Sequence, residues 1–150
     1  MAPFTRFASM PVQFHSEGVQ FRLANRTKLI DAIKFIGLLE QKELGDINVV
    51  FVSDKRLLGL NRRFLSHDYY TDIVTFQYPA PPTVISGDLY ISKDRVLDNS
   101  KSLGLLFTDE LSRVIIHGVL HLCGYRDKTH VEKKLMRKKE DFYLNSMKSL

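Results

Sequence analysis

The chain of 150 residues contains a single cysteine, Cys123. One cysteine cannot form an intramolecular disulfide, and chains without disulfides are typical of reducing compartments. Long hydrophobic runs are also missing, since no segment approaches the roughly 18 apolar residues that a transmembrane helix needs. The N-terminal segment MAPFTRFASMPVQF lacks the apolar core of a secretory signal peptide. These absences predict a soluble, cytoplasmic protein without a membrane partner.

The sequence has no internal repeat, no low-complexity segment and no linker that would separate domains. Its hydrophobic content of 44% and its charged content of 26% are ordinary for a globular protein. A chain of this length can bury a core without disulfides. We therefore expect one domain that spans residues 1–150.

The charge is unevenly distributed. The chain carries 22 Lys and Arg against 17 Asp and Glu, and residues 126–150 alone hold eight basic and four acidic side chains. A basic stripe of this kind is typical of a surface that binds a polyanion, and Lys134, Arg137 and Lys138 are the candidates for such contacts. The alternative is an ordinary solvated helix face. Composition leaves both interpretations open.

Periodicity predicts strands early in the chain and helices toward its end. A loose alternation over residues 12–23 indicates a hairpin or two short strands. The run INVVFV is typical of a strand buried on both faces. The other expected elements are a helix capped by Asn25, a short helix opened by Ser53 and Asp54, strands over residues 72–76 and 84–92, a helix from Thr108 to Cys123, and a helix over residues 131–147. This order predicts an α+β fold, with a small mixed sheet of about four strands covered by helices.

Several side chains have structural interpretations. Asp72 and Asp88 lie near strand ends, where turn or capping roles are expected. Cys123 should point away from His121 as a small buried hydrophobe. The apolar stripe of the last helix should face the core, and it consists of Leu135, Met136, Phe142, Tyr143 and Met147.

The segment HGVLHLCGYRD combines residues that can bind a metal ion. Helix positions four residues apart lie on one face, so His117 and His121 direct both imidazoles at one point. Gly124 can take the left-handed conformation that ends a helix, which lets Asp127 reach the same point. Two neutral imidazoles and a carboxylate, with a fourth position open to water, are the ligand set of a catalytic zinc site. We therefore predict one zinc ion at the end of a central helix, with His130 as an alternative to Asp127.

The spacing H-x-x-x-H-x-x-G-x-x-[H/D] is that of the zincin metal-binding frame. Those proteases carry a glutamate general base directly after the first histidine, and here that position is Gly118. The difference argues against peptide hydrolysis by their mechanism. Water would then be activated by the metal, because coordination lowers the pKa of water, and no general base is identified.

The same segment resembles the signature of the YbeY family of single-strand-specific metallo-endoribonucleases, H-G-x-L-H-L-x-G-Y-D-H. Further blocks agree with the family pattern in order, namely Leu60-Asn61, TDIVTF with Pro79, the strand GDLYIS and the basic last helix. The resemblance implies a small mixed sheet with several helices and one zinc ion bound by the three motif residues. It also implies ribosomal RNA and the small subunit as partners, 16S rRNA 3′-end maturation and ribosome quality control as functions, and no organic cofactor.

The sequence departs from the family pattern at two positions. Asp127 stands where the family usually has a third histidine, so the site has one positive charge less, and harder metals become more competitive. Leu65 stands where the family commonly has an arginine in the cleft. Arg62, Arg63 and His67 are candidates to replace that arginine, with a solvated helix face as the alternative for the two arginines.

Tyr69 and Tyr70 are candidates to stack on unpaired bases, with packing as the alternative. Together these features predict a zinc-dependent endoribonuclease that acts on ribosomal RNA. The alternative from another class is a ribosome-assembly or RNA-binding factor whose metal site is structural. A metal hydrolase acting on a small molecule is disfavoured by the basic last helix.

Overall fold

The computed structural model describes residues 11–66 and 71–149, and it confirms the α+β class. The elements of the described residues are β1 (Val12–Ser16), α1 (Arg26–Leu39), β2 (Glu43–Val52), α2 (Asp54–Phe64), β3 (Ile73–Gln77), β4 (Val84–Ser92), α3 (Lys93–Leu103), α4 (Phe107–Leu122) and α5 (His130–Lys148). None of the helices in this part of the chain combines the length and the apolar character needed to cross a membrane.

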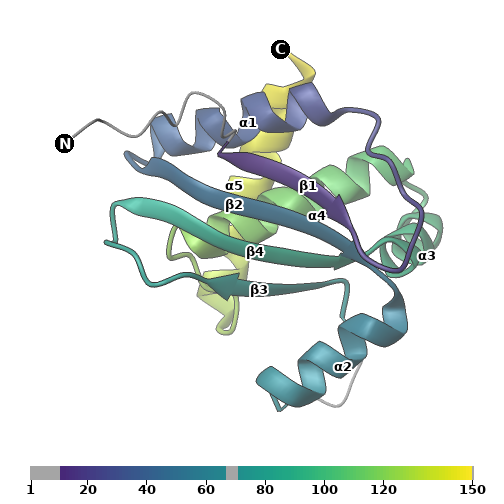
Figure 1. Ribbon diagram of the computed structural model, residues 1–150. Helices are drawn as coiled ribbons and strands as arrows, with labels where there is room; N and C mark the ends of the chain where they lie inside the picture. Colours follow the sequence, from purple (N-terminus) through teal and green to yellow (C-terminus); the bar gives the residue numbers. More distant parts are fainter. Residues whose placement is uncertain (1–10, 67–70, 150) are drawn as a thin grey trace.

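The strands form one mixed sheet in the order β1-β2-β4-β3 (Figure 1). β1, β2 and β4 run parallel, and β3 pairs antiparallel with β4 at the edge. β2 and β4 are neighbours although α2 and β3 lie between them in sequence. This crossover leaves β3 as the outer strand of the described sheet, on the side where the histidine motif lies.

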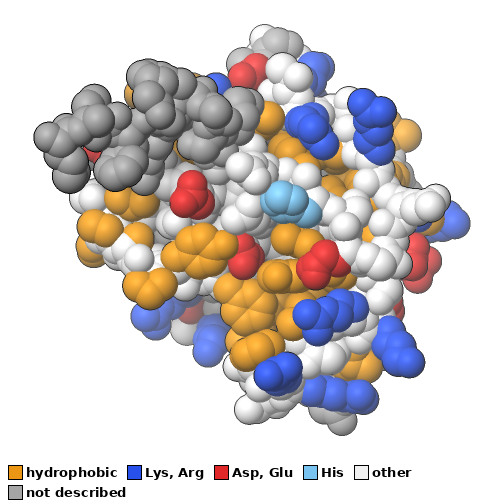
Figure 2. Space-filling view, in the orientation of Figure 1, with side chains coloured by type: hydrophobic (Ala, Val, Ile, Leu, Met, Phe, Trp, Pro, Cys, Tyr) orange, Lys and Arg blue, Asp and Glu red, His pale blue; other side chains and the backbone are white. Residues whose placement is uncertain are grey.

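Two hydrophobic clusters hold the sheet between its helices. α1, α4 and α5 pack on one face against Ile47, Val49 and Phe51 of β2. Val50 and Val52 point to the other face, into a smaller cluster beneath α2. The INVVFV strand is therefore buried on both faces, as its sequence predicts. Figure 2 views the molecule from the side opposite the main helical layer, and Lys and Arg side chains gather there over α2.

The prediction of a hairpin or two strands over residues 12–23 is wrong. These residues contain one strand, β1, which pairs parallel with β2 and so cannot form a hairpin with it. The chain turns at Gly18, whose φ is +66°. Phe21 then packs edge-on against Phe51, at 4.7 Å between ring centroids, and against Phe107. Aromatic burial thus takes these residues toward the core without a second strand.

Helix α3 is absent from the sequence prediction. It is a polar helix in which Val96 and Ser100 are the buried residues, so its hydrophobic periodicity is weak. Its ends do carry recognisable signals. The Ser92 hydroxyl accepts a hydrogen bond from the Arg95 N–H, and Gly104 closes the helix in the left-handed conformation.

Of two further predicted helix caps, the one at Thr108 is wrong and the one at Asn25 is correct only in position. Asn25 stands at the N-cap of α1, but its side chain donates to Ser112 Oγ of α4 at 3.3 Å and makes no capping bond. Helix α4 begins at Phe107, so Thr108 lies inside its first turn. Ser53 does cap α2, as expected, by accepting a hydrogen bond from the Arg56 N–H.

The last helix, α5, begins with a capping box. Thr129 accepts from the Glu132 N–H while the Glu132 carboxylate accepts from the Thr129 N–H. Met136, Tyr143 and Met147 face the core, but Leu135 and Phe142 are 43% and 51% exposed. The predicted apolar stripe was therefore too wide, because only one side of it reaches α1 and α4.

Candidate metal centre and cleft

The three predicted ligands come together where α4 ends. His117 Nε2 lies 3.0 Å from His121 Nε2. Asp127 Oδ2 lies 3.2 Å from His117 Nε2 and 3.4 Å from His121 Nε2. In the described residues these three form the one cluster of three or more His, Cys, Asp or Glu side chains able to share an ion. Their side chains are 23%, 26% and 38% exposed, so the point between them is reachable from solvent.

This triangle suits a small tetrahedral ion. Zinc with bonds of about 2.0–2.1 Å to nitrogen and oxygen separates any two of its ligand atoms by about 3.3–3.4 Å. The observed separations of 3.0–3.4 Å need little adjustment to match that value. Two imidazole nitrogens and one carboxylate oxygen are also donors that zinc accepts. The residues present therefore fit a zinc ion with one open position.

The turn that brings Asp127 back depends on Gly124. Its φ is +108°, and its N–H donates to the His121 carbonyl at 2.9 Å, while the Tyr125 N–H donates to the Leu120 carbonyl at 3.1 Å. A positive φ at the glycine that follows a helix is what the sequence predicts. The backbone of the turn thus closes the helix and redirects the chain within three residues.

Gly124→Ala should lower the free energy of unfolding by about 1–2 kcal/mol, because an L side chain at positive φ is strained. No heavy atom lies within 4 Å of a Cβ placed there, so the loss would come from the backbone alone. Zinc content should fall too, although no ligand is changed. Denaturant unfolding and metal analysis measure both.

Gly59→Ala is the matched control. Gly59 lies in α2 with equally open surroundings and no positive φ, so alanine there should stabilise the protein by about 0.5–1 kcal/mol. A Gly124→Ala protein as stable as the original would show that the turn tolerates a side chain.

Gly118, which occupies the position of the protease glutamate, has no space for a side chain. A Cβ there would lie 2.7 Å from Ile73 Cδ1 and 2.9 Å from Leu89 Cδ2. Helix α4 packs directly against β3 and β4 at this point. The close contact explains why a carboxylate does not follow His117 in this fold.

Both histidines are oriented through their Nδ1 atoms. His117 Nδ1 lies 2.7 Å from Glu140 Oε2, and His121 Nδ1 lies 2.9 Å from the Tyr125 carbonyl oxygen. Because both partners accept hydrogen bonds, each imidazole carries its proton on Nδ1 and presents the Nε2 lone pair to the shared point. A carboxylate behind a histidine is the usual support for a zinc ligand.

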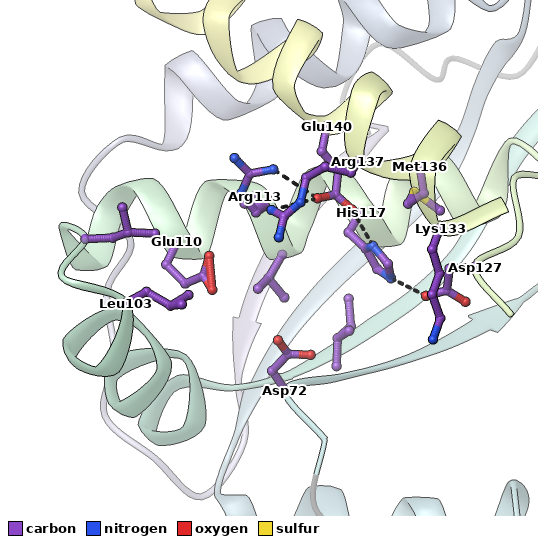
Figure 3. A pocket seen from close by; sticks show the side chains of 13 residues that line it. Asp72, Leu103, Glu110, Arg113, His117, Asp127, Lys133, Met136, Arg137 and Glu140 are labelled. Atoms are coloured by element: carbon purple, nitrogen blue, oxygen red, sulfur yellow. Dashed lines mark hydrogen bonds and ion pairs between the residues drawn. The ribbon is translucent and has the colours of Figure 1, made fainter. Parts of the chain in front are cut away.

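Glu140 is anchored in turn by Arg113. The Arg113 guanidinium donates to Glu140 Oε1 at 3.0 Å (Figure 3). It also pairs with Asp141 at 2.8 Å. Burial favours the neutral form of Glu140, yet the hydrogen bonds from His117 and Arg113 hold its pKa below the ordinary value. Glu140 is therefore a carboxylate, which lets it accept the His117 proton donor.

A second group of contacts holds the turn itself. The hydroxyl groups of Tyr125 and Tyr143 donate to the two oxygens of Glu40 at 2.5 and 2.6 Å, and Lys139 Nζ donates to the same carboxylate at 3.1 Å. Burial works against the charge on Glu40, but these hydrogen bonds lower its pKa. These contacts hold the end of α1, the turn after α4 and helix α5 together beside Tyr125, whose carbonyl oxygen is the hydrogen-bond partner of His121.

Two connected depressions open on the site, with volumes of about 530 and 480 Å³. His117, Asp127 and Asp72 line both of them. The larger one also contains Glu110 and the charged groups of α5, and Figure 3 shows Glu110 reaching it from α4 and Asp72 from the segment before β3. The smaller one follows the outer strand β3. A solvent-open cleft thus runs past the candidate metal point in two directions.

Burial raises the pKa of both carboxyl groups in this cleft. For Glu110 the nearby Asp72 adds to the effect, whereas Arg113 and Arg137 oppose it. For Asp72 the charge of His117 opposes it. The expected turn or capping role of Asp72 therefore misses its main feature, a carboxyl group facing the cleft. Asp88 lies inside β4 and accepts hydrogen bonds from Tyr78 and Asn48.

The structure divides the candidates for RNA contact into residues that line the two depressions and residues that lie outside them. Arg137 lines the larger depression, together with Lys133, which the sequence interpretation omitted. Lys134 and Lys138 are exposed but line neither depression. Arg62 and Arg63 lie on α2 outside both, whereas Leu65 lines the smaller one.

The remaining candidates have other positions. His130 begins α5, is exposed and does not belong to the ligand cluster. Cys123 packs against the main core, where burial raises its pKa to about 12, in agreement with its expected role as a small hydrophobe. His67, Tyr69 and Tyr70 lie outside the described residues.

Three residues of the site had escaped the sequence prediction, namely Glu110, Arg113 and Glu140, and a fourth, Asp72, had been given a turn or capping role. Glu110, Arg113 and His117 are three to four residues apart, so helical spacing alone places them on one face of α4. That spacing was a usable signal. Asp72 and Glu140 come from other elements, and local sequence carries no sign of their proximity.

The fold and the site together define a class of protein, namely an α+β protein with a His-His-Asp cluster in an open cleft. Residues 13–148 match the sequence model of the family described as Endoribonuclease YbeY, and the chain belongs to this family.

Relatives confirm the assignment. The chain is 44% identical over 135 residues to an Endoribonuclease YbeY of Cytophaga hutchinsonii, which covers 90% of this chain and 94% of that protein. It is 42% identical over 132 residues to the Endoribonuclease YbeY of Bacteroides thetaiotaomicron, and this match covers 88% of this chain and 96% of that protein. The solution structure of a Thermotoga maritima protein matches with a TM-score of 0.59 and 29% identity over 91% of this chain and 88% of that one. The family named from the motif is thus confirmed.

Proposed function

We propose that the protein is a zinc-dependent endoribonuclease for single-stranded RNA, formed by residues 1–150 as one domain. The observation that carries this proposal is the triangle of His117, His121 and Asp127 at the floor of an open cleft, in a chain of the YbeY endoribonuclease family. Ribosomal RNA is the proposed substrate and the small subunit the proposed partner. The proposed reactions are 16S rRNA 3′-end maturation and cleavage in ribosome quality control.

Each residue has a proposed task. His117, His121 and Asp127 hold the ion, and Glu140 and the Tyr125 carbonyl fix the two imidazoles with Nε2 forward. When bound, zinc supplies a Lewis acid that polarises a phosphoryl oxygen and acidifies water. The cationic side chains of Lys133 and Arg137 attract the phosphate backbone toward the same cleft.

The test is cleavage of a 3′-terminal precursor fragment of small-subunit RNA by nuclease-free, zinc-loaded protein. We expect internal cuts in unpaired segments and none in the same fragment annealed to its complement. His117→Ala should cleave neither. Binding of the fragment without cleavage would contradict the proposal and favour an RNA-binding factor with a structural metal.

Replacing Lys133 and Arg137 with glutamine should weaken RNA binding and flatten its salt dependence. For single strands each lost phosphate contact lowers the slope of log K against log salt by about 0.7, so two contacts account for about 1.4. Fluorescence anisotropy with a labelled single strand, repeated over a range of salt, measures the slope.

The control variant replaces Lys134 and Lys138, which carry the same charge on the same helix but lie outside the cleft. It should change the slope much less. Equal effects of the two variants would mean that RNA follows the outer face of α5, as the basic-stripe interpretation of the sequence has it.

A further inference from the structure

The sheet face opposite the main helical layer carries a row of aromatic side chains. Phe76 of β3 and Tyr90 of β4 lie on this face, packed against the small cluster beneath α2, and Phe64 ends α2 beside them. The Phe64 and Phe76 ring centroids are 5.4 Å apart, and those of Phe76 and Tyr90 are 5.7 Å apart, both edge-on. Phe64 is 55% exposed and the other two rings are half-buried. These three rings form an aromatic ridge, and Figure 2 shows hydrophobic side chains gathered in the middle of this face.

The ridge lies across β3 from the smaller depression. Thr75 and Gln77 line that depression, and Phe76 between them directs its side chain to the opposite face of the strand. Phe64 likewise precedes Leu65, which lines the same depression. Because β3 is the outer strand of the described sheet, an RNA strand that leaves the cleft reaches the ridge by crossing one β-strand. The cleft and the ridge are therefore neighbouring parts of the surface.

Positive charge borders the ridge on the side of α2. This helix carries four basic side chains and one acidic one, and Figure 2 shows them beside the hydrophobic side chains. The Arg63 guanidinium lies over the Phe64 ring, 5.2 Å from its centroid. Burial raises the pKa of Tyr90, and the charge of Arg56 is near enough to oppose that rise. Rings next to cationic groups suit a polyanion better than an uncharged apolar partner.

Negative charge limits where phosphate groups can lie. The carboxylates of Glu17 and Asp88 add to the raised pKa of Tyr90, so both are near its ring. Asp88 also accepts hydrogen bonds from Tyr78 and, at 3.3 Å, from Asn48. These groups disfavour phosphates over the sheet. We therefore expect a bound backbone to follow the Arg63 end of α2, with its bases turned toward the rings.

We infer that the aromatic ridge is a stacking platform for the bases of single-stranded RNA, outside the cleft and next to it. The inference rests on the proposed endoribonuclease function for the identity of the ligand. Unpaired bases stack on aromatic side chains with little regard to sequence, while basic groups hold the backbone. A ridge of this size serves about two or three bases. The platform would hold one unpaired segment while the neighbouring segment lies at the metal centre.

A single tryptophan on the ridge gives a direct test. The chain contains no tryptophan, so Phe64→Trp introduces the one indole, and a base stacked on it quenches its fluorescence. The full-length, zinc-loaded variant is mixed rapidly with a short oligouridine, and the emission is read before cleavage. We expect the emission to fall as the strand saturates the protein, and to stay constant with the same strand annealed to oligoadenine.

Phe142→Trp is the matched control. Phe142 is 51% exposed, lies on α5 and lines neither depression. Its indole should keep its emission when the same oligouridine is added. Equal quenching at both positions would show that the bases have no preferred platform, and it would overturn the inference.

Phe64→Ala should weaken the binding of oligouridine roughly five- to a hundredfold, the range of one lost base–aromatic contact. Phe142→Ala removes an equally exposed ring and should leave the affinity unchanged. Fluorescence anisotropy of the labelled strand measures both, and thermal unfolding shows that both variants fold. Unchanged emission of Phe64→Trp at saturating strand, or unchanged affinity of Phe64→Ala, overturns the platform and leaves a protein partner for this face.

The two proposals fail separately. Quenching at Phe64→Trp without RNA cleavage would overturn the endoribonuclease function and leave the platform. Cleavage of single-stranded RNA without quenching would overturn the platform and leave the endoribonuclease function.

Discussion

Asp127→Ala should remove most of the bound zinc and abolish RNA cleavage. The carboxylate is the third of the three proposed ligands, and its Oδ2 lies within 3.4 Å of both imidazole Nε2 atoms. Loss of a residue that merely supports a ligand lowers metal affinity 10–100-fold, so loss of the ligand itself should exceed about 100-fold. Isothermal titration of the metal-free protein with zinc, followed by a cleavage assay, gives both quantities.

Two further variants define the ligand set. His130→Ala should keep the zinc affinity of the original protein, because His130 lies outside the cluster. Asp127→His should bind zinc through three imidazoles, since histidine nitrogen is a normal zinc ligand. If His130→Ala loses the metal while Asp127→Ala keeps it, the third ligand is misassigned, although the pair of His117 and His121 would stand.

Glu140→Gln should lower zinc affinity by about 10–100-fold without touching a ligand. The carboxylate accepts a hydrogen bond from His117 Nδ1 at 2.7 Å and so leaves Nε2 to face the proposed ion. Glutamine keeps the size but is free to turn its amide donor toward His117, which would favour the wrong tautomer. Cleavage should fall together with the affinity at limiting zinc and recover partly when zinc is in excess.

Asp141→Asn is the control for this experiment. Asp141 pairs with the same Arg113 at 2.8 Å, is largely exposed and makes no contact with His117. Its replacement should leave zinc affinity within about twofold of the original, because an exposed ion pair contributes little. Equal losses from both variants would mean that Arg113, and not the Glu140 carboxylate, maintains the site.

The metal cluster was predictable because its geometry is local. His117 and His121 are four residues apart on one helix, and Gly124 and Asp127 follow His121 by three and six residues. Helix geometry and the positive φ of a glycine after a helix are properties of short segments. The β2 and β4 strands were predictable for a similar reason, since each is a compact β-branched or alternating run.

The supporting residues could not be placed in the same way. Glu140 lies 23 residues after His117 and meets it only because α5 packs back on α4. Glu40 lies 85 residues before Tyr125, and the two meet because α1 ends beside the turn. Helix α3 and the course of residues 17–23 depend on a few buried contacts that give no periodic pattern. Distant contacts of this kind require the packed fold.

The proposed RNA cleavage at one zinc ion held by His117, His121 and Asp127 can be followed in a zinc titration of metal-free protein. Bound zinc per chain and the rate of single-strand cleavage are recorded in the same samples. We expect the rate to be zero without metal, to rise with bound zinc and to level off at one ion per chain, and we expect His117→Ala neither to bind zinc nor to cleave RNA. Cleavage by the metal-free protein, or by zinc-free His117→Ala, would contradict it.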